Sequence, residues 1–598
     1  MNETKRNEQT TQFIQKKANM IWNVADILRG LYKPHEYGKV ILPMTVIKRL
    51  HDTLLPTRHA VLEAAEKYKE MNDTMRSRFL EKASGFAFYN TSMFTFDTLI
   101  ADANNIEENF RAYLNGFSDN MQDILSNFKF EQEITNMAEN NMLFAVITEF
   151  NKTSSYLGPD MVTSTDMGYI FEELVRKFSE SYNEEAGAHF TSRDIIYLMT
   201  DLLLAEDSET LVGENVVKTV YDQTMGTSQM LSAMIERIHD FNESVEVRTF
   251  GQELNPELNP ETFAIAKADT MIRGGDPENM TKGNTLSNDQ FTDYTFDYCI
   301  SNPPFGIDWK SAKAAVEAEH KLGEAGRFGP GLPKISDGQL LFQLNGVAKL
   351  KETGRMAIIH NGSALFSGNA GGGESAIRQY VIENDWVEAI VQLPTDLFYN
   401  TGISTYIWIL TKNKSAERQG KIQLIDASKM FEKRRKNIGN KRVDITEECR
   451  EMIVEAYGEF QNREYQLVDK TVESKIFDNA DFGFTKVTVE SPLRDENGEI
   501  ILKKGKPTPD ASLRDTEDIP LKENIQEYFE REVLPFNPDA WMDRKKDKIG
   551  FEIPFTRLFY KYTAPEPSEV IAERIKQLEE SIVANFEALS GKDVSNVD

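Results

Sequence analysis

The sequence predicts an α/β protein: a helical N-terminal domain, a core with a doubly wound sheet, and a mixed α+β region that ends in a helix. Three patterns indicate this architecture. Residues up to about 160 carry apolar positions at helical spacing, residues from about 165 to 415 alternate short β-rich runs with helical stretches, and later residues are charged and mixed. Alternation of strand and helix is typical of a parallel sheet with crossover helices.

The first element is the helical domain, predicted over residues 1–160. Spacings of four and three residues separate successive members of one apolar stripe, which consists of Ile14, Ala18, Ile21, Ala25 and Leu28. This spacing places the side chains on one face of a helix. No sustained period-two pattern interrupts the region, so we expect helices throughout.

The second element is the core, predicted over residues 161–415. It contains six β-rich runs, at 216–221, 245–250, 296–300, 355–359, 387–393 and 405–410. The helical stretches between them favour a Rossmann-like, doubly wound sheet. Folds of this kind bind ligands at the carboxyl ends of the strands.

The remaining elements follow residue 415. Residues 416–563 are predicted to be mixed α/β, with a hairpin near 487–502 because Asn497-Gly498 is a typical two-residue hairpin turn between 487–489 and 500–502. Residues 564–598 are predicted to form a terminal helix, after Pro565 and Pro567 and before Gly591. Its apolar stripe consists of Ile571, Ile575, Leu578, Ile582, Phe586 and Leu589. The near-heptad spacing fits docking on partner helices, and packing on its own domain is the alternative.

The most informative motif is Asn302-Pro303-Pro304-Phe305, directly after the run 296–300. A nucleobase amine is a poor nucleophile because its lone pair is delocalised, so an enzyme that methylates it must hold the nitrogen near tetrahedral geometry. The Asn302 side-chain carbonyl and the Pro303 carbonyl can accept its two N–H groups, and Phe305 offers a face for stacking. The prolines stiffen the turn and add no competing donor. The alternative is an ordinary strand-ending turn.

Two further signals indicate a nucleotide-like cofactor. The first predicted strand of the core ends in Asp222 and turns into a helix through Gly226, Thr227 and Ser228. A glycine at such a turn lets the backbone approach a ligand. The second strand runs into Glu253, whose carboxylate can accept hydrogen bonds from ribose hydroxyls. Dinucleotide-binding enzymes share both features, but the amine-holding motif after the run 296–300 favours S-adenosylmethionine.

Composition sets limits on the class of protein. The length of 598 residues and the lack of a run of roughly 18 apolar residues or of a hydrophobic signal core predict a soluble, multidomain protein of the cytoplasm without membrane contact. Cys299 and Cys449 are too few and too far apart for a disulfide framework, and the seven histidines show no ligand spacing, so no metal is expected.

The net charge of −28 opposes binding to nucleic acid, because the molecule as a whole repels phosphate. Positive charge must therefore be local or supplied by a partner. The local candidates are 433–436 with 441–442, and 544–546, each of which is also readily interpreted as a solvated loop.

Together these motifs resemble the modification (M) subunits of Type I restriction-modification systems, which are N6-adenine DNA methyltransferases. The resemblance covers most of the chain to about residue 415. It is carried by 21–30 and 40–50 in the helical domain, 168–174 and 187–192 before the sheet, and 361–362 and 393–403 in the later core, besides the motifs above.

The resemblance implies a methyltransferase core with the cofactor's methionine end over the turn after Asp222 and its ribose at Glu253. The implied wrapping segment is Gly187, Ala188, His189, Phe190, Thr191 and Ser192. Asn284 lies where a polar group would meet the cofactor's adenine ring, with a plain loop residue as the alternative. A flipped adenine would stack on Phe305 while Asn302 and Pro303 hold its amine for direct displacement. No covalent nucleophile is needed, and Cys299 is expected to face away from the base.

Three departures from the family pattern affect the cofactor site. The usual first motif, Asp-Pro-x-x-Gly-Ser/Thr-Gly, here lacks its proline and its last glycine, which Gln223 and Ser228 replace. Ser192 stands where proline is usual. The tetrapeptide that begins at Glu253 is repeated at Glu257, so either carboxylate could hold the ribose; Glu253 is preferred because it directly follows the strand.

No segment after the amine-holding motif has the basic and aromatic character of a DNA-reading domain. The resemblance implies that a separate specificity (S) subunit reads double-stranded DNA, with a second M subunit and a restriction (R) subunit for cleavage. The alternatives are a self-sufficient DNA adenine methyltransferase, a methyltransferase for RNA or protein amides, and a scaffold subunit without activity.

Overall fold

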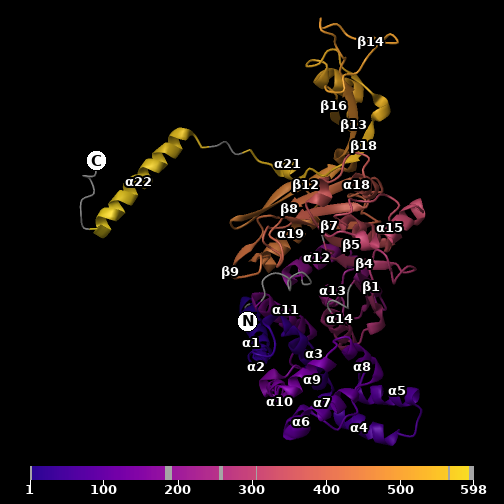
Figure 1. Cartoon of the computed structure of the whole chain (residues 1–598), viewed down its shortest axis with the longest axis vertical. Helices are drawn as coiled ribbons and strands as arrows, with labels where there is room; N and C mark the ends of the chain where they lie inside the picture. Colours follow the sequence, from indigo (N-terminus) through magenta and orange to yellow (C-terminus); the bar gives the residue numbers. More distant parts are fainter. Residues whose placement is uncertain (1–2, 182–190, 255–259, 305, 563–565, 591–598) are drawn as a thin grey trace. The chain divides into compact units, whose positions relative to one another are not determined.

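The computed structural model describes residues 3–590 apart from 182–190, 255–259, 305 and 563–565 (Figure 1). The chain divides into two compact units, Met1–Ile553 and Pro554–Asp598. The fold class is the predicted one: a helical N-terminal region precedes a large mixed sheet, and the described chain ends in a helix.

The N-terminal region is helical because its apolar residues recur at helical spacing and are buried. The five residues of the predicted stripe are between 0% and 7% exposed. The helices are α1 (Glu3–Trp22), α2 (Val24–Leu28), α3 (Gly38–Leu54), α4 (Arg58–Lys67), α5 (Asp73–Ser84), α6 (Phe96–Ala101), α7 (Ile106–Asn115), α8 (Asp119–Ser126), α9 (Glu131–Glu139), α10 (Leu143–Phe150) and α11 (Ser164–Ser181). Their hydrophobic core also takes in Ala264, Ile265 and Ala268 of α14 (Pro260–Ile272), a helix from the sheet region. The limit at residue 160 stays a prediction, and the two regions share part of one core.

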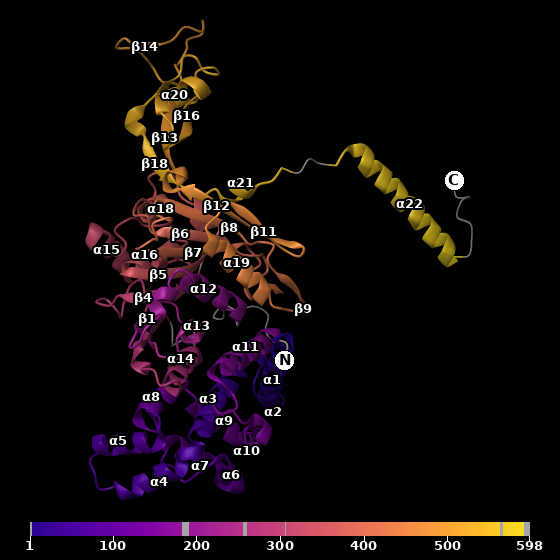
Figure 2. The same cartoon turned by 180° about the vertical axis from the view of Figure 1, so that it is seen from behind.

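The main sheet has ten strands in the order β11-β12-β8-β6-β7-β5-β4-β1-β2-β3. Figure 2 labels β11, β12 and β8 toward one end of the sheet and β4 and β1 toward the other. All six predicted strands are present in it. Its strands are β1 (Val217–Asp222), β2 (Glu246–Glu253), β3 (Met280–Lys282), β4 (Phe296–Ser301), β5 (Leu350–Asn361), β6 (Val387–Gln392), β7 (Thr405–Thr411), β8 (Lys421–Asp426), β11 (Arg463–Leu467) and β12 (Lys470–Asp478). The sheet is mixed because β7 lies antiparallel between β5 and β6.

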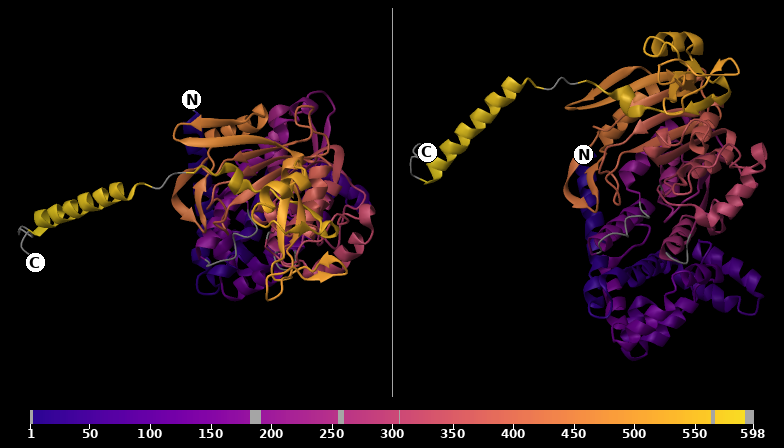
Figure 3. Two further views of the ribbon diagram at one scale, coloured as in Figure 1. Left: turned by 90° about the horizontal axis from the view of Figure 1, so that it is seen from above. Right: turned by 45° about the horizontal axis from the view of Figure 1, so that its top comes forward.

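Helices cover both faces of the sheet (Figure 3). Tyr298 and Ile300 of β4 share a hydrophobic core with α12 (Arg193–Ala205), α13 (Gln229–Phe241) and α19 (Glu447–Glu459). Between them, Cys299 points to the other face, where its Sγ lies 3.9 Å from the Gly346 carbonyl of α16 (Gln339–Ala348). The helix α18 (Gly373–Glu383) contacts α16 on that side. Successive strand residues point to opposite faces, so burial on both sides explains why these strands are apolar runs.

The direction of winding changes between β1 and β4. From β1 the chain builds β2 and β3 outward on one side, and it then returns to place β4 and β5 on the other, all four pairings being parallel. The crevice outside the carboxyl ends of two such strands is where open α/β sheets bind ligands. It lies between Asp222, the last residue of β1, and Asn302, the first residue after β4.

Two expectations for the C-terminal part need correction. The sheet continues past residue 415 with β8, β11 and β12, so the predicted end of the core does not coincide with the sheet's edge. The predicted hairpin pairing of 487–489 with 500–502 is wrong. Residues 487–489 belong to β13 (Gly483–Glu490), which pairs with β16 (Asp515–Pro520), β17 (Trp541–Met542) and β18 (Lys548–Phe551).

Burial explains this choice of partner strands. Val489 packs with Phe529 and Val533 and is buried there. Leu502, on the predicted partner segment, is 61% exposed and would not bury it. The turn at Gly498 does form, with φ of 83°, and it closes a short antiparallel pairing of 493–495 with 499–501 rather than one with β13. The small ribbon of β14 (Leu502–Lys503) and β15 (Lys506–Pro507) follows.

The second unit contains α21 (Phe555–Phe559) and α22 (Ser568–Ser590). The apolar stripe predicted for the terminal helix lies on α22, where Ile571, Ile575, Leu578, Ile582 and Phe586 are 43% to 64% exposed. Gly591, the predicted stop, is outside the described residues. Among the described helices, none combines the length and the apolar character needed to cross a bilayer.

Candidate active site

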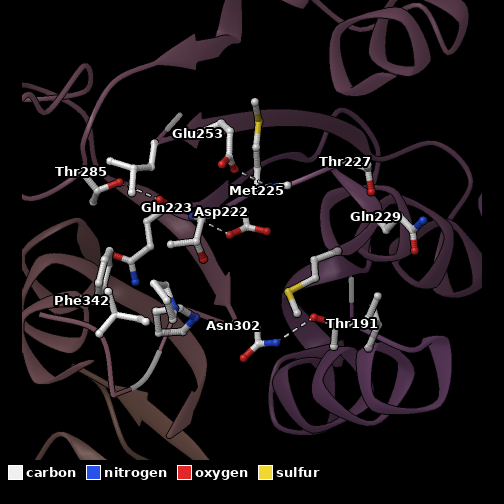
Figure 4. Close-up of a pocket in the computed structure, with 18 of the residues that line it drawn as sticks. Thr191, Asp222, Gln223, Met225, Thr227, Gln229, Glu253, Thr285, Asn302 and Phe342 are labelled. Carbon is white, nitrogen blue, oxygen red and sulfur yellow. Dashed lines mark hydrogen bonds between the residues drawn. The ribbon is translucent and has the colours of Figure 1, made fainter. Parts of the chain in front are cut away.

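A pocket of about 400 Å³ lies in the crevice between the ends of β1 and β4 (Figure 4). The turn after β1, the end of β2 and the residues after β4 form its walls. Of the predicted site residues, those that line it are Thr191, Asp222, Gly226, Thr227, Glu253, Asn284, Asn302, Pro303 and Pro304. Residues from five separate segments thus meet at the place where the topology predicts a ligand.

Asp222 is almost fully buried, at 1% exposure. Its Oδ1 accepts a hydrogen bond of 3.0 Å from the backbone N–H of Thr224. Burial raises the pKa of this carboxyl to about 7; the Thr224 N–H opposes the rise, and the charge of Glu253 adds to it. The carboxyl therefore titrates near neutral pH, and a cation in the pocket would stabilise its ionised form.

The turn after Asp222 is held by the second strand. The Gly226 N–H donates to Glu253 Oε2 at 2.9 Å, and the Met225 N–H donates to the Gln252 carbonyl at 3.1 Å. Both Gly226 and Ser228 take left-handed conformations, with φ of 52° and 68°. Ser228 replaces the last glycine of the family motif, so the substitution falls at a position where a side chain costs about 1 kcal/mol or more.

Asn302 presents an unused acceptor to the pocket. Its Nδ2 donates to Thr191 Oγ1 at 2.9 Å, and this bond orients the amide (Figure 4). Its Oδ1 is buried and has no hydrogen-bond partner among the described residues. A buried carbonyl without a partner is costly, so its presence in the wall of a pocket indicates a ligand that donates a hydrogen bond.

The end of β4 is joined to the turn after β1. Thr224 Oγ1 and Ser301 Oγ lie 2.9 Å apart and share a hydrogen bond. Asp337 holds the residues after the motif, because its Oδ1 accepts from the Gly306 N–H at 3.2 Å and its Oδ2 from Ser363 Oγ at 2.9 Å. The two loops of the site are therefore tied to each other and to the end of β5.

Other predicted residues lie beside the pocket or beyond the description. Ser192 and Ser228 are buried next to pocket residues but do not line it. Asn284 lines it, yet its Oδ1 accepts from the Leu286 N–H of its own loop at 2.9 Å, as in the loop interpretation. The predictions for Gly187, Ala188, His189, Phe190, Phe305 and Glu257 lie outside the described residues.

The structure adds residues that the motifs did not reveal. Gln223, in the place of the motif's proline, accepts at Oε1 from Asn345 Nδ2 at 2.7 Å and through its carbonyl from Thr285 Oγ1 at 2.6 Å. Phe342 and Phe398 supply aromatic walls. Gln223 and Phe398 lay in segments singled out by sequence, but Phe342 comes from α16, whose approach to β1 depends on the tertiary fold.

Cys299 takes no part in the pocket. Its thiol is 2% exposed on the α16 side of the sheet, and burial raises its pKa well above the usual range. A neutral thiol facing away from Asn302 is not a nucleophile for a base in the pocket.

Most of the chain matches models of known protein families. Residues 163–489 match the family model of N-6 DNA Methylase, and residues 17–150 match that of the HsdM N-terminal domain. The Type I restriction enzyme MjaIX methylase subunit of Methanocaldococcus jannaschii is 23% identical over 532 residues, or 86% of this chain and 87% of that protein. The MjaVII methylase subunit of the same organism is 30% identical over 332 residues, or 50% of this chain and 54% of that one.

The fold is also found among solved structures. The methyltransferase subunit of a type I restriction-modification system from Streptococcus thermophilus aligns with a TM-score of 0.60 at 23% identity, covering 78% of this chain and 97% of that one.

Proposed function

Because the chain belongs to the N-6 DNA methylase family, as a modification subunit of the Type I restriction-modification kind, we propose that it methylates the N6 amine of a flipped adenine in DNA with S-adenosylmethionine as methyl donor. The observation that carries the proposal is Asn302, whose buried, unpartnered Oδ1 faces the pocket while Thr191 occupies its Nδ2.

The residues of the pocket fit the cofactor. Asp222 offers a buried carboxyl that a cationic ligand would ionise, and Glu253 offers a carboxylate at the end of the second strand. The glycine turn between them brings backbone close to the pocket at Gly226. Bound there, S-adenosylmethionine supplies an electrophilic methyl group. We assign its ribose to Glu253, its methionine end to the turn after Asp222, and its wrapping to residues 187–192.

The chain itself holds the target amine. Asn302 Oδ1 accepts one N–H and the Pro303 carbonyl the other, which draws the nitrogen toward tetrahedral geometry and frees its lone pair. Phe305 stacks on the flipped base and offsets part of the cost of unstacking it. The bond between Asn302 and Thr191 fixes the acceptor before the base arrives, so catalysis is by positioning.

Sequence specificity belongs to partners in this proposal. A net charge of −28 disfavours DNA binding by the chain alone, so we assign reading of double-stranded DNA to an S-type subunit, with a second M subunit beside it. An R-type subunit would join for cleavage, and with DNA as substrate the site of action is the cytoplasm. The exposed apolar stripe of α22 is proposed to dock on helices of the S-type subunit.

The test of the cofactor and of the reaction uses Glu253→Gln. The wild type should bind S-adenosylmethionine in calorimetry and, assembled with an S-type subunit, should transfer its labelled methyl group to N6 of adenine. The variant should bind the cofactor roughly 10- to 100-fold more weakly, because it loses charge-assisted hydrogen bonds to ribose.

Glu257→Gln is the matched control, because it alters the repeated copy of the same tetrapeptide. A loss of affinity in Glu257→Gln but not in Glu253→Gln would move the ribose site to the second copy. Label found in RNA, in protein or on another base of DNA would contradict the proposed reaction.

Asp222→Asn should have opposite effects on cofactor affinity and on stability. The wild-type carboxyl ionises only near pH 7, so its affinity for a cationic cofactor should fall, by up to about tenfold per pH unit, as the pH drops below 7. The variant should bind more weakly at pH 8 and lack this part of the dependence. The cofactor's own ionisation affects both proteins equally, so the ratio of wild-type to variant affinity at each pH reports the contribution of Asp222 alone.

The same raised pKa sets the sign of the stability effect. Asp222 has a higher pKa in the folded state than the ordinary 3.8, so it lowers stability as the pH rises from about 4 to about 7. The cofactor-free variant should therefore unfold at a higher temperature than the wild type at pH 8. Equal melting temperatures together with equal pH profiles would show that Asp222 neither titrates near 7 nor meets the cofactor.

A further inference from the structure

A two-stranded ribbon of β9 (Glu432–Ile438) and β10 (Lys441–Asp444) concentrates positive charge in a strongly acidic chain. Lys433, Arg435 and Arg442 are exposed on it. We call these three residues the ribbon cations. Their grouping departs from the charge of the chain as a whole.

The ribbon is attached to the wall of the pocket. The Asn440 N–H donates to the Tyr399 carbonyl at 2.9 Å, and the Arg442 N–H donates to the Asp396 carbonyl at 2.8 Å. Phe398 and Asn400, which flank Tyr399, line the pocket. The ribbon cations therefore belong to a strand pair hydrogen-bonded to the loop that forms one side of the site.

A buried cation also anchors the ribbon. Lys441 is 1% exposed, and its Nζ lies 2.9 Å from Asp194 Oδ2 and 3.1 Å from the Leu397 carbonyl. Asp194 is the second residue of α12 and follows Ser192, the last residue of the predicted wrapping segment, by two positions. The ribbon is therefore joined both to the pocket loop and to the chain next to that segment. Its position relative to the site is thus held by charged and backbone hydrogen bonds.

The charges on the ribbon fall into two groups. Lys441 pairs with Asp194, and Arg434 pairs with Asp444, so these two serve the fold. By contrast, Lys433, Arg435 and Arg442 form no ion pair with a carboxylate in the described part of the chain. Their charge remains available to an external anion.

Resting on the proposed function, we infer that the ribbon cations bind backbone phosphates of the DNA strand next to the flipped adenine. A strand that delivers a base to the pocket must pass its mouth, and lysine and arginine neutralise phosphates there. The rival explanation is that these cations bind an acidic protein. Such a protein would lie beside the loop 396–400 and compete with the DNA strand for the same place. The ribbon thus supplies positive charge next to the pocket loop of a strongly acidic chain.

The test replaces all three ribbon cations by glutamine in the assembled complex with an S-type subunit. Loss of three phosphate contacts should reduce the slope of log affinity against log salt by about 2.7, so that between 50 and 200 mM salt the wild type loses about 40-fold more DNA affinity than the variant. The maximal rate at saturating DNA and the affinity for S-adenosylmethionine should not change, because no ribbon cation lines the pocket.

A matched control carries the same change of charge elsewhere. Lys503, Lys504 and Lys506 are exposed on the β14–β15 ribbon and do not line the pocket. Their triple replacement by glutamine should leave the salt slope at its wild-type value. Should the triple ribbon variant unfold, the single variants Lys433→Gln, Arg435→Gln and Arg442→Gln should each lower the slope by about 0.9.

The outcomes separate the explanations. A wild-type salt slope in the folded ribbon variant would overturn the inference. Failure of that variant to assemble with the S-type subunit, while the control assembles, would overturn it in favour of a protein contact. Lack of methyl transfer in the wild-type complex at every salt concentration would refute the proposed function instead, so the two failures are distinguishable.

Discussion

Asn302→Ala should lower the rate of methyl transfer by about 10²- to 10³-fold or more, while S-adenosylmethionine still binds. The substitution removes the only side-chain acceptor of the motif, and removal of one preorganised hydrogen-bonding group from a catalytic site has an effect of this size. Single-turnover transfer of labelled methyl in the assembled complex measures the loss, and calorimetry measures cofactor binding.

Two further variants test the role of Asn302. Thr191→Val keeps the acceptor but removes the Oγ1 that receives Nδ2, so the amide is no longer held and the rate should fall by an intermediate factor. Asn302→Asp keeps acceptor oxygens and should retain more activity than alanine. A rate for Asn302→Ala within a few-fold of wild type, in a folded protein, would remove Asn302 from the mechanism.

The second large effect is dependence on a partner. The purified chain should bind cofactor yet show no site-specific methylation until an S-type subunit is added. Specific DNA sites are typically bound about 10³- to 10⁷-fold more tightly than other sequences, and a chain with a net charge of −28 is not expected to reach that selectivity without a partner. Methylation of a defined site by the single chain would contradict the assignment of specificity to a partner.

Deletion from Glu569 onward should prevent that assembly, because it removes the exposed apolar stripe of α22. The core should remain folded and bind cofactor, since Met1–Ile553 is compact by itself. A control that replaces Lys576 and Glu580, exposed polar residues of α22, by alanine should assemble normally. Normal assembly of the truncated chain would show that α22 is not the docking element.

Local patterns determined much of this protein. The six core strands could be recognised because each is a short apolar run between helical stretches, and burial on both faces of a sheet selects such runs. The sequence also predicted that Asp222, Glu253 and Asn302 lie near one another. Each ends or directly follows a strand, and the carboxyl ends of parallel strands meet at one edge of a sheet. The charge of −28 indicated that positive charge must be local or supplied by a partner, without saying which.

Contacts between distant segments decided the rest. Asn302 and Thr191 are 111 residues apart, and nothing local to Asn302 shows that its carbonyl is left for the pocket. The ribbon of β9 and β10 was one of two basic candidates in the sequence, and only its hydrogen bonds to Asp396 and Tyr399 join it to the pocket loop. Likewise β13 pairs with β16, β17 and β18 and not with the residues after the turn at Gly498, and its Val489 is buried against Phe529 and Val533. Hydrogen bonds and packing between distant segments decide which of several locally possible conformations is adopted. Because the two residues of such a contact lie in different segments, neither segment alone predicts the contact.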